Sequence, residues 1–568
     1  MLICGIKVTH DGGVAVIEDG QLRFSTEVEK LGNGERYSSL GDLERVTEIL
    51  RSEGLEPADV DQFVVDGWFT GDDSEQVVST EPSRIRTLSG GRPLELTVAP
   101  YHDRVGVGDP IARHTFGDHD FGAPGSGYAS YHHVSNHLLG AYCSSPFAAR
   151  GEDALVLVWD GGMAPRLYRV EAATRTVAWV DTLFPLAGST FSDFSSQFEP
   201  FIRNTDGLTP DEAMRSDLSI AGKAMAYAAL GKVEESAFPV FDTILADFRD
   251  APSNDTKDVG RKVAANRDEL FPGLTNADLI ATFQAYVGNL VLERMRSLVQ
   301  RGSRVSRPNL VLGGGCALNI KWNSALRGSG LFREIWIPPF PNDSGAAIGT
   351  ASCEMFRREQ RIALDWNVYS GPRVAVGDVP AGWHPTPCDE RQLAGLLHHR
   401  GEPVVVLSGR AEIGPRALGN RSILAPATSL AVKDRLNAIK DRASYRPVAP
   451  ICLTSRAAEV FTPGGSDPYM LFEHRTRAGW TERIPAVLHL DGTARLQTID
   501  ASTDTATSRI LTAYEEISGI PVLCNTSANL NGSGFFPDVA SAARWGGTHY
   551  IWSDGTLWTG PAAGATGT

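Results

Sequence analysis

Two copies of one strand-and-turn pattern restrict the fold of this 568-residue chain most strongly. Residues 2–8, 13–18 and 21–26 predict short strands joined by the Gly-containing turns HDGG and EDGQ, the pattern of an antiparallel meander. The segment LVLVWDGG (155–162) predicts a buried strand with a second Gly turn, and LYRV and TVAWVDTL continue it into a second meander. A helix predicted at 277–301 then leads into NLVLGGGCALN, a strand, a Gly-rich turn and a helix start.

The Gly-rich turns point to a nucleotide cleft, because glycine has no Cβ and its backbone amides can approach phosphate oxygens. A single Gly turn is more often structural. The order of meander, second meander and Gly-rich helix start, however, resembles the actin, sugar-kinase and heat-shock ATPase fold. The candidate nucleotide-binding residues are Asp11, Gly12, Gly161, Gly162, Gly313, Gly314 and Asn319.

Length and composition indicate two α/β domains. Single hydrophobic cores stop growing beyond roughly 250–300 residues, so 568 residues require at least two. The stretch between about Asn367 and Pro387 is rich in Pro and Gly and predicts a link. We expect one domain at 1–370 and a second α/β domain at 388–568.

Charge and hydropathy argue against nucleic acid and membrane as partners of the chain. The net charge of −15 disfavours nucleic acid, and no apolar run is long enough to span a bilayer. The amino terminus lacks the pattern of a signal peptide and the seven Cys form no CxxC pair, so we expect a cytoplasmic protein with reduced structural thiols. One basic stretch stands out: Ser408 to Arg446 holds eight Lys or Arg and three acids. It is either a solvated face or an anion pocket.

The sequence HHVSNH supplies a candidate metal site. His133 and His137 are four residues apart, so on a helix both imidazoles lie on one face. Asp160 and Asp343 occur at strand-to-Gly turns that could meet the same cleft. Two His and two carboxylates suit iron, manganese or zinc. The alternative is an ordinary polar helix face.

The second domain carries candidate anion-binding residues. GRAEIGPRALGNRS, LNAIKDRASYRPVAP and LHLDGTARLQ place Arg and Lys beside turn residues, and PVLCNTSANLN ends a strand in small hydrogen-bonding side chains. Asn525, Ser527 and Asn531 could orient phosphate groups without adding charge. The alternative is that they cap the next helix.

These motifs resemble the family of O-carbamoyltransferases that act on nodulation factors, tobramycin and 3-hydroxymethylcephem. THDGGVAVIEDG resembles the opening meander of the family, HHVSNH its metal helix, WDGG a phosphate turn, LGGGCALN an adenosine turn and PNDSGAAIGTA a final metal turn. The motifs of the second domain are close to those of the family, and EDGQLRFSTEVEK looks most like the cephem branch. The stretch EVEKLGNGERY departs from the usual Glu-Glu-Arg-Phe, and Ala528 stands where Phe is usual.

The resemblance implies a two-site, ATP-dependent enzyme. A carboxy-terminal YrdC-like domain would form carbamoyl adenylate from carbamoyl phosphate and ATP, with Mg²⁺ for the nucleotide. The candidate residues for this step are Lys440, Arg446, Arg495, Asn525, Ser527 and Asn531, with Arg416 and Arg442 as secondary candidates that could instead pair with Glu412 and Asp441.

The amino-terminal domain, similar to the iron-containing tRNA threonylcarbamoyl transferase, would pass the carbamoyl group to a hydroxyl. The ligands of a divalent metal, most simply ferrous iron, would be His133, His137, Asp160 and Asp343, and Asp343 would also be catalytic through that metal. His10 is the candidate general base, or else it orients the turn backbone.

The main alternative is a sugar or small-molecule kinase that uses the amino-terminal fold alone, but it leaves the basic second domain unexplained. The acceptor is expected to be a hydroxyl of a secondary metabolite, on an antibiotic nucleus or an attached sugar. Residues 70–130 and 185–260 match no known motif and are expected to shape the acceptor pocket. The sequence leaves open which hydroxyl is modified and whether the protein forms a homodimer.

Overall fold

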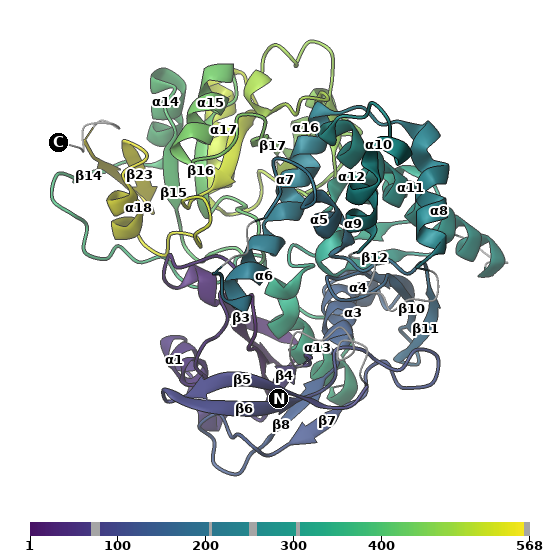
Figure 1. Cartoon of the computed structure of the whole chain (residues 1–568). Coiled ribbons are helices and arrows are strands. Elements are labelled where there is room, and N and C mark those ends of the chain that lie inside the picture. The colour runs from purple at the N-terminus through teal and green to yellow at the C-terminus, as the bar shows by residue number, and fades with distance from the viewer. Residues whose placement is uncertain (70–79, 204–206, 249–257, 303–306, 360, 562–568) are drawn as a thin grey trace. The chain divides into compact units, whose positions relative to one another are not determined.

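The computed structural model describes the chain except residues 70–79, 204–206, 249–257, 303–306, 360 and 562–568 (Figure 1). The chain divides into two compact units. The first contains Met1–Val28 and Tyr37–Asn367, and the second contains Glu29–Arg36 and Val368–Thr568. Among the described residues, no helix is both long and apolar enough to cross a membrane.

The first sheet of the first unit begins with the predicted meander. Strand β1 pairs antiparallel with β2 and parallel with β4, and β4 pairs parallel with β8. The strand order is β3 (Gln21–Glu27), β2 (Gly13–Glu18), β1 (Leu2–Lys7), β4 (Gln62–Asp66), β8 (Tyr128–Tyr131) and β7 (His114–Phe116). The carboxyl ends of the parallel strands β1, β4 and β8 therefore lie at one edge of the sheet.

The second sheet repeats this arrangement. Strand β9 pairs antiparallel with β10 and parallel with β12. The order is β11 (Thr176–Thr182), β10 (Arg166–Glu171), β9 (Ala154–Val158), β12 (Leu310–Gly313) and β13 (Ile335–Trp336). In both sheets, the first strand of the meander also pairs with a parallel strand on its other side. Two sheets with this strand order are typical of the actin and sugar-kinase fold. The predicted fold class is confirmed.

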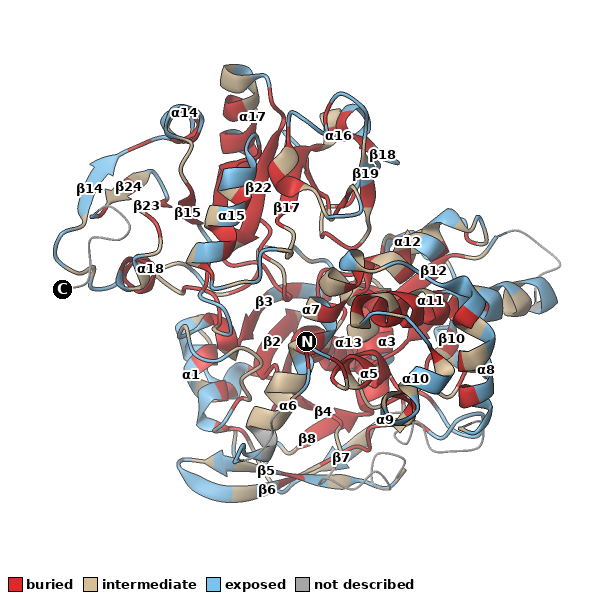
Figure 2. Ribbon diagram, turned by 45° about the horizontal axis from the view of Figure 1, so that its top comes forward, coloured by how far each residue is buried: buried red, intermediate tan, exposed pale blue. Residues whose placement is uncertain are grey.

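Two buried helices of the first unit carry or adjoin the candidate metal-binding residues predicted from the sequence. Helix α3 (His133–Cys143) and helix α13 (Ala346–Arg358) pack against each other, and α13 also packs on β1. Both helices are almost entirely buried (Figure 2). Their close approach requires glycine, since a Cβ added at Gly349 would lie 2.3 Å from the carbonyl oxygen of Asn136.

The remaining helices and strands of the first unit surround this core. The described residues of 185–260 are mostly helical, whereas those of 70–130 contain the hairpin β5–β6. The elements are α1 (Glu44–Ser52), β5 (Ser83–Ser89), β6 (Arg92–Val98), α4 (Pro146–Arg150), α5 (Thr190–Ser195), α6 (Pro210–Leu218), α7 (Ile220–Tyr227), α8 (Phe238–Ala246), α9 (Asp258–Ala265), α10 (Arg267–Leu270), α11 (Asn276–Gly302) and α12 (Ile320–Gly328).

The second unit is built on a mixed sheet. Its buried strand β22 lies between β16 and β17 and pairs antiparallel with both. The order is β14 (His384–Pro387), β24 (Thr556–Thr559), β23 (Tyr550–Ser553), β15 (Val404–Leu407), β16 (Arg421–Pro426), β22 (Val522–Ser527), β17 (Ala449–Leu453) and β21 (Gln497–Ile499).

Among the described residues, a small sheet and five α-helices complete the second unit. Figure 2 shows that the central strands β15, β16 and β17 are buried, that the edge strand β14 is exposed, and that helices such as α17 combine buried and exposed positions. The small sheet contains β18 (Phe461–Thr462), β19 (His474–Thr476) and β20 (Thr493–Ala494). The helices are α14 (Glu390–Arg400), α15 (Leu430–Ile439), α16 (Thr454–Val460), α17 (Ala506–Ser518) and α18 (Val539–Trp545).

The boundary between the units differs from the expected one in two places. Residues 29–36, expected in the first domain, belong to the second unit. The expected link at 367–387 is also largely part of the second unit, and its end forms strand β14. Proline suggested a link there, but β14 is an edge strand, where a missing N–H is tolerated.

Candidate functional site

Four side chains of the first unit converge as the sequence predicts. The ligand atoms of His133, His137, Asp160 and Asp343 all lie within 4.8 Å of one another, and all four residues are buried. The Nε2 atoms of the two imidazoles are 3.2 Å apart, and each lies 3.4 Å from Oδ1 of Asp343. Ligands about 2.1 Å from a shared tetrahedral centre are about 3.4 Å apart, so this set fits a small divalent cation.

The fold brings these ligands together from three places. Helix α3 presents His133 and His137 one turn apart, which is the geometry expected of residues four apart. Asp160 follows strand β9, and Asp343 lies in a 3-10 turn just before α13. Helix α3 begins only at His133, because Ser130 and Tyr131 pair with β4 as part of β8.

A second set of polar groups orients the ligands. Asp66, at the end of β4, lies with Oδ2 2.8 Å from Nδ1 of His133. An Nδ1–H donated to this carboxylate leaves Nε2 with its lone pair toward the other ligands, as in carboxylate–histidine–metal sites. The Tyr101 hydroxyl donates to Oδ2 of Asp160 at 2.9 Å, and the backbone N–H of Gly315 donates to Oδ1 at 2.7 Å.

Lys7 balances the charge of the carboxylates. Its ammonium lies 2.9 Å from Asp66 and 2.8 Å from Asp343, and it is fully buried over the ring of Trp68. Three carboxylates and one ammonium leave a net charge of −2 when both imidazoles are neutral. A divalent cation would make this buried group neutral, whereas a trivalent ion would leave an excess positive charge.

The pKa values of the ligands follow from this charge distribution. Burial alone would lower the pKa of His133, but Asp66 and Asp343 raise it well above its usual value. Burial would raise the pKa of Asp343, but Lys7 and His133 hold it well below its usual range. The carboxylate therefore stays ionised, as a metal ligand must be.

His10 lies beside this centre. Its Nδ1 is 2.9 Å from Oδ2 of Asp11, its Nε2 is 3.5 Å from Oδ2 of Asp343, and its ring makes an edge contact with Trp68. An imidazole held by one carboxylate and next to the ligand set has the position that a general base would need.

Close backbone packing accounts for several of the Gly positions. A Cβ at Gly12 would lie 2.2 Å from the Leu40 nitrogen, and one at Gly313 would lie 2.7 Å from the His137 carbonyl oxygen. Gly314 has φ +88° and touches the backbone of Trp159. Asn319 caps α12 by accepting from the N–H groups of Lys321 and Trp322. The nucleotide role of these residues, and of Asp11, Gly161 and Gly162, stays a prediction.

The second unit contains a buried lysine at the end of the strand that the sequence singled out. The Lys440 ammonium donates to Oδ1 of Asn529 at 2.6 Å, to its carbonyl oxygen at 2.8 Å and to Oγ of Ser527 at 3.1 Å. These acceptors are neutral. Ser527 lies at the last position of β22, so the strand end holds the cation in place.

Arginines surround this lysine. Burial lowers the pKa of Lys440, and Arg442, Arg36 and Arg446 lower it further. Burial likewise lowers the pKa of Arg495, with added repulsion from Arg442, Arg446 and Arg36, and Arg416 acts on Arg442 in the same way. We call Arg36, Arg416, Lys440, Arg442, Arg446 and Arg495 the basic cluster. Mutual repulsion of this kind is relieved when an anion binds.

The other candidates of the second unit have structural contacts. Asn525 donates to Oε1 of Gln497 at 2.6 Å and to the Ala417 carbonyl oxygen, and the exposed Asn531 donates to the Asp441 carbonyl oxygen at 3.1 Å. Oε1 of Glu412 accepts from the backbone N–H groups of Leu418, Asn420 and Arg421. The side chain of Arg442 reaches Thr526 and Pro447.

Sequence reasoning missed Asp66, Lys7, Tyr101, Asn529 and Arg36. Two of them carried a usable signal: Asp66 precedes Gly67 after a buried strand, as Asp160 precedes Gly161, and Asn529 belongs to the same NTSANLN motif as Ser527. Lys7, Tyr101 and Arg36 carried none, because only the tertiary fold places them.

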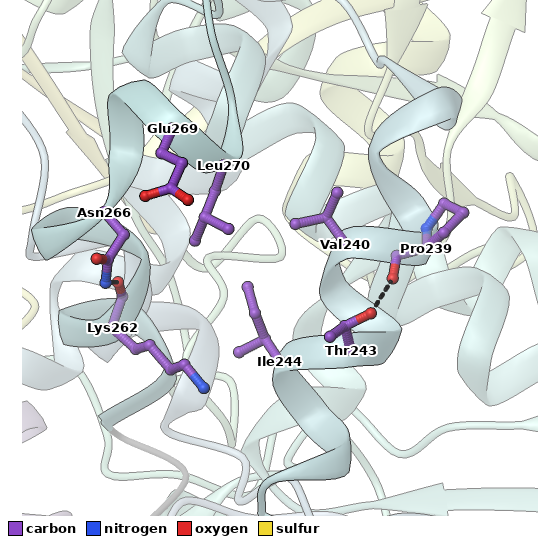
Figure 3. A pocket seen from close by; sticks show the side chains of 8 residues that line it. All are labelled: Pro239, Val240, Thr243, Ile244, Lys262, Asn266, Glu269 and Leu270. Atoms are coloured by element: carbon purple, nitrogen blue, oxygen red, sulfur yellow. Dashed lines mark hydrogen bonds between the residues drawn. The ribbon is translucent and has the colours of Figure 1, made fainter.

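A separate pocket of about 520 Å³ opens between α8 and the helices α9 and α10 (Figure 3). Its wall combines the apolar side chains of Val240, Ile244 and Leu270 with Lys262 and Glu269. It shares no residue with the metal-type ligand set or the basic cluster.

Comparison with known proteins identifies the family. The carbamoyltransferase N-terminus family matches residues 2–352, and the carbamoyltransferase C-terminus family matches residues 395–549. Nodulation protein U of Sinorhizobium fredii is 45% identical over 100% of both chains. The 3'-hydroxymethylcephem-O-carbamoyltransferase of Streptomyces clavuligerus is 32% identical over 96% of both chains. Glucokinase from Balamuthia mandrillaris aligns with 62% of this chain and 92% of its own, at 10% identity and a TM-score of 0.26.

The chain belongs to the carbamoyltransferase family and is a carbamoyltransferase. The resemblance drawn from its motifs is confirmed. Over the full chain the identity is higher to nodulation protein U than to the cephem enzyme, although the opening segment looked most like the cephem branch.

Proposed function

We propose that this protein is an ATP-dependent O-carbamoyltransferase with two separate reaction sites. The observation that carries the proposal is the division of chemistry between the units. The first unit holds a buried ligand set for a divalent metal, and the second holds a cluster of buried or half-buried cations suited to phosphates. A kinase that used the amino-terminal fold alone would need only the first unit.

The second unit would form carbamoyl adenylate. Water cleaves the P–O bond of carbamoyl phosphate to give carbamate and phosphate; a carbamate oxygen then attacks the α-phosphorus of ATP, and pyrophosphate leaves. Lys440, Arg446 and Arg495 would bind the phosphates, because phosphoryl transfer depends on positioning and charge stabilisation. Ser527 would fix the ammonium of Lys440, which it contacts. Asn525, Asn531, Arg416 and Arg442 would shape the surrounding loops.

The first unit would transfer the carbamoyl group. The acceptor hydroxyl attacks the carbonyl carbon, its proton passes to a base, and AMP leaves with the bridging oxygen. His10 would be that base, oriented by Asp11. His133, His137, Asp160 and Asp343 would hold the metal. When bound, such a metal, with iron as the candidate, supplies Lewis acidity for the carbonyl.

The acceptor would be a hydroxyl of a secondary metabolite. Its chemical class is inferred from relatives whose names point to nodulation and to the hydroxymethyl group of a cephem. We place the enzyme with small-molecule acceptors rather than with RNA because the chain carries a net charge of −15.

The first test is carbamoyl-phosphate-dependent exchange of labelled pyrophosphate into ATP. We expect exchange in the wild type and a loss of about 10- to 100-fold in Arg495→Ala and Arg446→Ala, since each removes a charged phosphate contact. Arg391→Ala is the matched control, because this arginine forms an exposed pair with Glu516. Undiminished exchange in both cluster variants would refute this assignment of the site.

The nucleotide product separates the two candidate functions. With an accepted alcohol, mass spectrometry should find a carbamate ester together with AMP and pyrophosphate. A phosphate ester with ADP would instead identify a kinase.

A further inference from the structure

Residues 29–36 leave the first unit and belong to the second. The chain passes from β3 into a short 3-10 helix (Val28–Lys30), and the six positions that follow, 31–36, remain in the second unit until the chain returns at Tyr37. We call residues 29–36 the inserted segment. Its sequence, EKLGNGER, contains two cations, Lys30 and Arg36.

Specific contacts fix the inserted segment on the second unit. Lys30 is buried, and its ammonium donates to the carbonyl oxygens of Glu412 at 2.6 Å and Gly414 at 2.8 Å. The Gly534 N–H donates to the Gly34 carbonyl oxygen at 2.7 Å. Gly534 is required at this contact, because a Cβ there would lie 1.9 Å from the Glu29 carbonyl oxygen.

The end of the segment lies against the loop that supports Lys440. Glu35 forms an antiparallel bridge with Ser533, and the Arg36 N–H donates to the Gly532 carbonyl oxygen at 3.1 Å. In the same loop, Asn529 accepts from the Lys440 ammonium, and Asn531 donates to the Asp441 carbonyl oxygen. The backbone of Arg36 therefore contacts the same loop, residues 529–533, that contacts Lys440 and Asp441.

The charge of Arg36 reaches the basic cluster. After burial, Arg36 is among the groups that lower the pKa of Lys440, Arg442 and Arg495. Its side chain is half-buried. The inserted segment places the charge of Arg36 beside other cations. Their repulsion destabilises the folded protein, and an anion bound among them would offset that repulsion.

We propose that Arg36 is a phosphate-binding residue of the second unit, delivered by the inserted segment. This inference rests on the proposed adenylate-forming function and names one more residue of that site. The ligand is a phosphate group, either of the nucleoside triphosphate or of the acyl phosphate. The segment follows the amino-terminal meander in the sequence and supplies Arg36 to the basic cluster. The carboxy-terminal part of the chain by itself, without this segment, would therefore form an incomplete site.

The test compares Arg36→Met with Arg36→Lys in the full-length protein. Pyrophosphate exchange is measured first with the ATP concentration varied at saturating carbamoyl phosphate. It is then measured with the carbamoyl phosphate concentration varied at saturating ATP. We expect kcat/KM of Arg36→Met to fall about 10- to 100-fold for the substrate whose phosphate Arg36 binds, with partial recovery in Arg36→Lys. Arg51→Met is the matched control, because Arg51 forms an exposed ion pair with Glu56 on the first unit.

A second variant tests the placement without touching the charge. Gly534→Ala should displace the inserted segment and reproduce the loss of Arg36→Met, whereas Gly465→Ala, whose Cβ meets nothing within 4 Å, should behave as the wild type. Full activity of Gly534→Ala would overturn the proposed placement.

Calorimetric titration with ATP and with carbamoyl phosphate separates this inference from the proposed function. Failure of the wild type to exchange pyrophosphate would contradict the proposed function, while a phosphate affinity that falls in Arg36→Met would still support the role of Arg36. Unchanged kcat/KM and unchanged affinity for both substrates in Arg36→Met would overturn it.

Discussion

At the residue scale, Asp66 determines how His133 can act. The imidazole is fully buried, and its Nδ1 lies 2.8 Å from the Asp66 carboxylate, which the Lys7 ammonium also contacts. The donated Nδ1–H fixes the ring orientation and leaves Nε2 as the atom that could bind a metal. The sequence signal for this role, Asp-Gly after a buried strand, is not specific, because the same pair also forms ordinary turns.

Replacement of this carboxylate should weaken metal binding. In Asp66→Asn we expect the affinity for a divalent metal to fall about 10- to 100-fold, the usual effect of losing a group that orients a ligand. The measurement is metal content by elemental analysis after equilibration with a graded series of chelator. Asp504→Asn, at a side chain that is 95% exposed, is the control. Equal metal retention in the two variants would show that Asp66 does not orient the ligand.

At the element scale, the contact between α3 and α13 sets the distance between the ligands. Helix α3 carries both histidines, and α13 begins just after Asp343. Gly140 and Gly349 allow the helices to approach, since a Cβ at Gly140 would lie 2.9 Å from Cα of Gly349. Helix α3 was predictable from the spacing of His133 and His137, but its contact with α13 was not, because a glycine in a helix does not reveal which element packs against it.

A methyl group in this contact should disturb the ligand set. We expect Gly349→Ala to destabilise the protein by about 1–3 kcal/mol, the usual range for overpacking, and to lower its metal content. The measurements are thermal unfolding and elemental analysis. Gly328→Ala on α12 is the control, because its Cβ would meet no atom within 4 Å. If Gly349→Ala matched that control in both measurements, the helix contact would not control the site.

At the scale of the whole molecule, the division into two units follows from length, but the path of the chain between them does not. The paired meanders, the Gly turns and the convergence of His133, His137, Asp160 and Asp343 were predictable, because each rests on local sequence patterns. The excursion of residues 29–36 was not, since a short polar stretch after a strand predicts only a loop. Side chains that act through tertiary contacts, such as Lys7, were hidden for the same reason.

The central claim is that adenylate formation and carbamoyl transfer occur at separate sites, and Asp343→Asn tests it most directly. Asp343 belongs to the ligand set of the first unit, and every member of the basic cluster belongs to the second unit. Loss of one ligand should therefore abolish transfer and leave adenylate formation intact.

Pyrophosphate and carbamate ester should be counted in one assay with ATP, carbamoyl phosphate and an accepted alcohol, for the wild type and for folded Asp343→Asn. The account predicts equal amounts of both products in the wild type, and in the variant pyrophosphate release with almost no carbamate ester. Loss of pyrophosphate release in step with carbamate formation would contradict it and would indicate a single composite site.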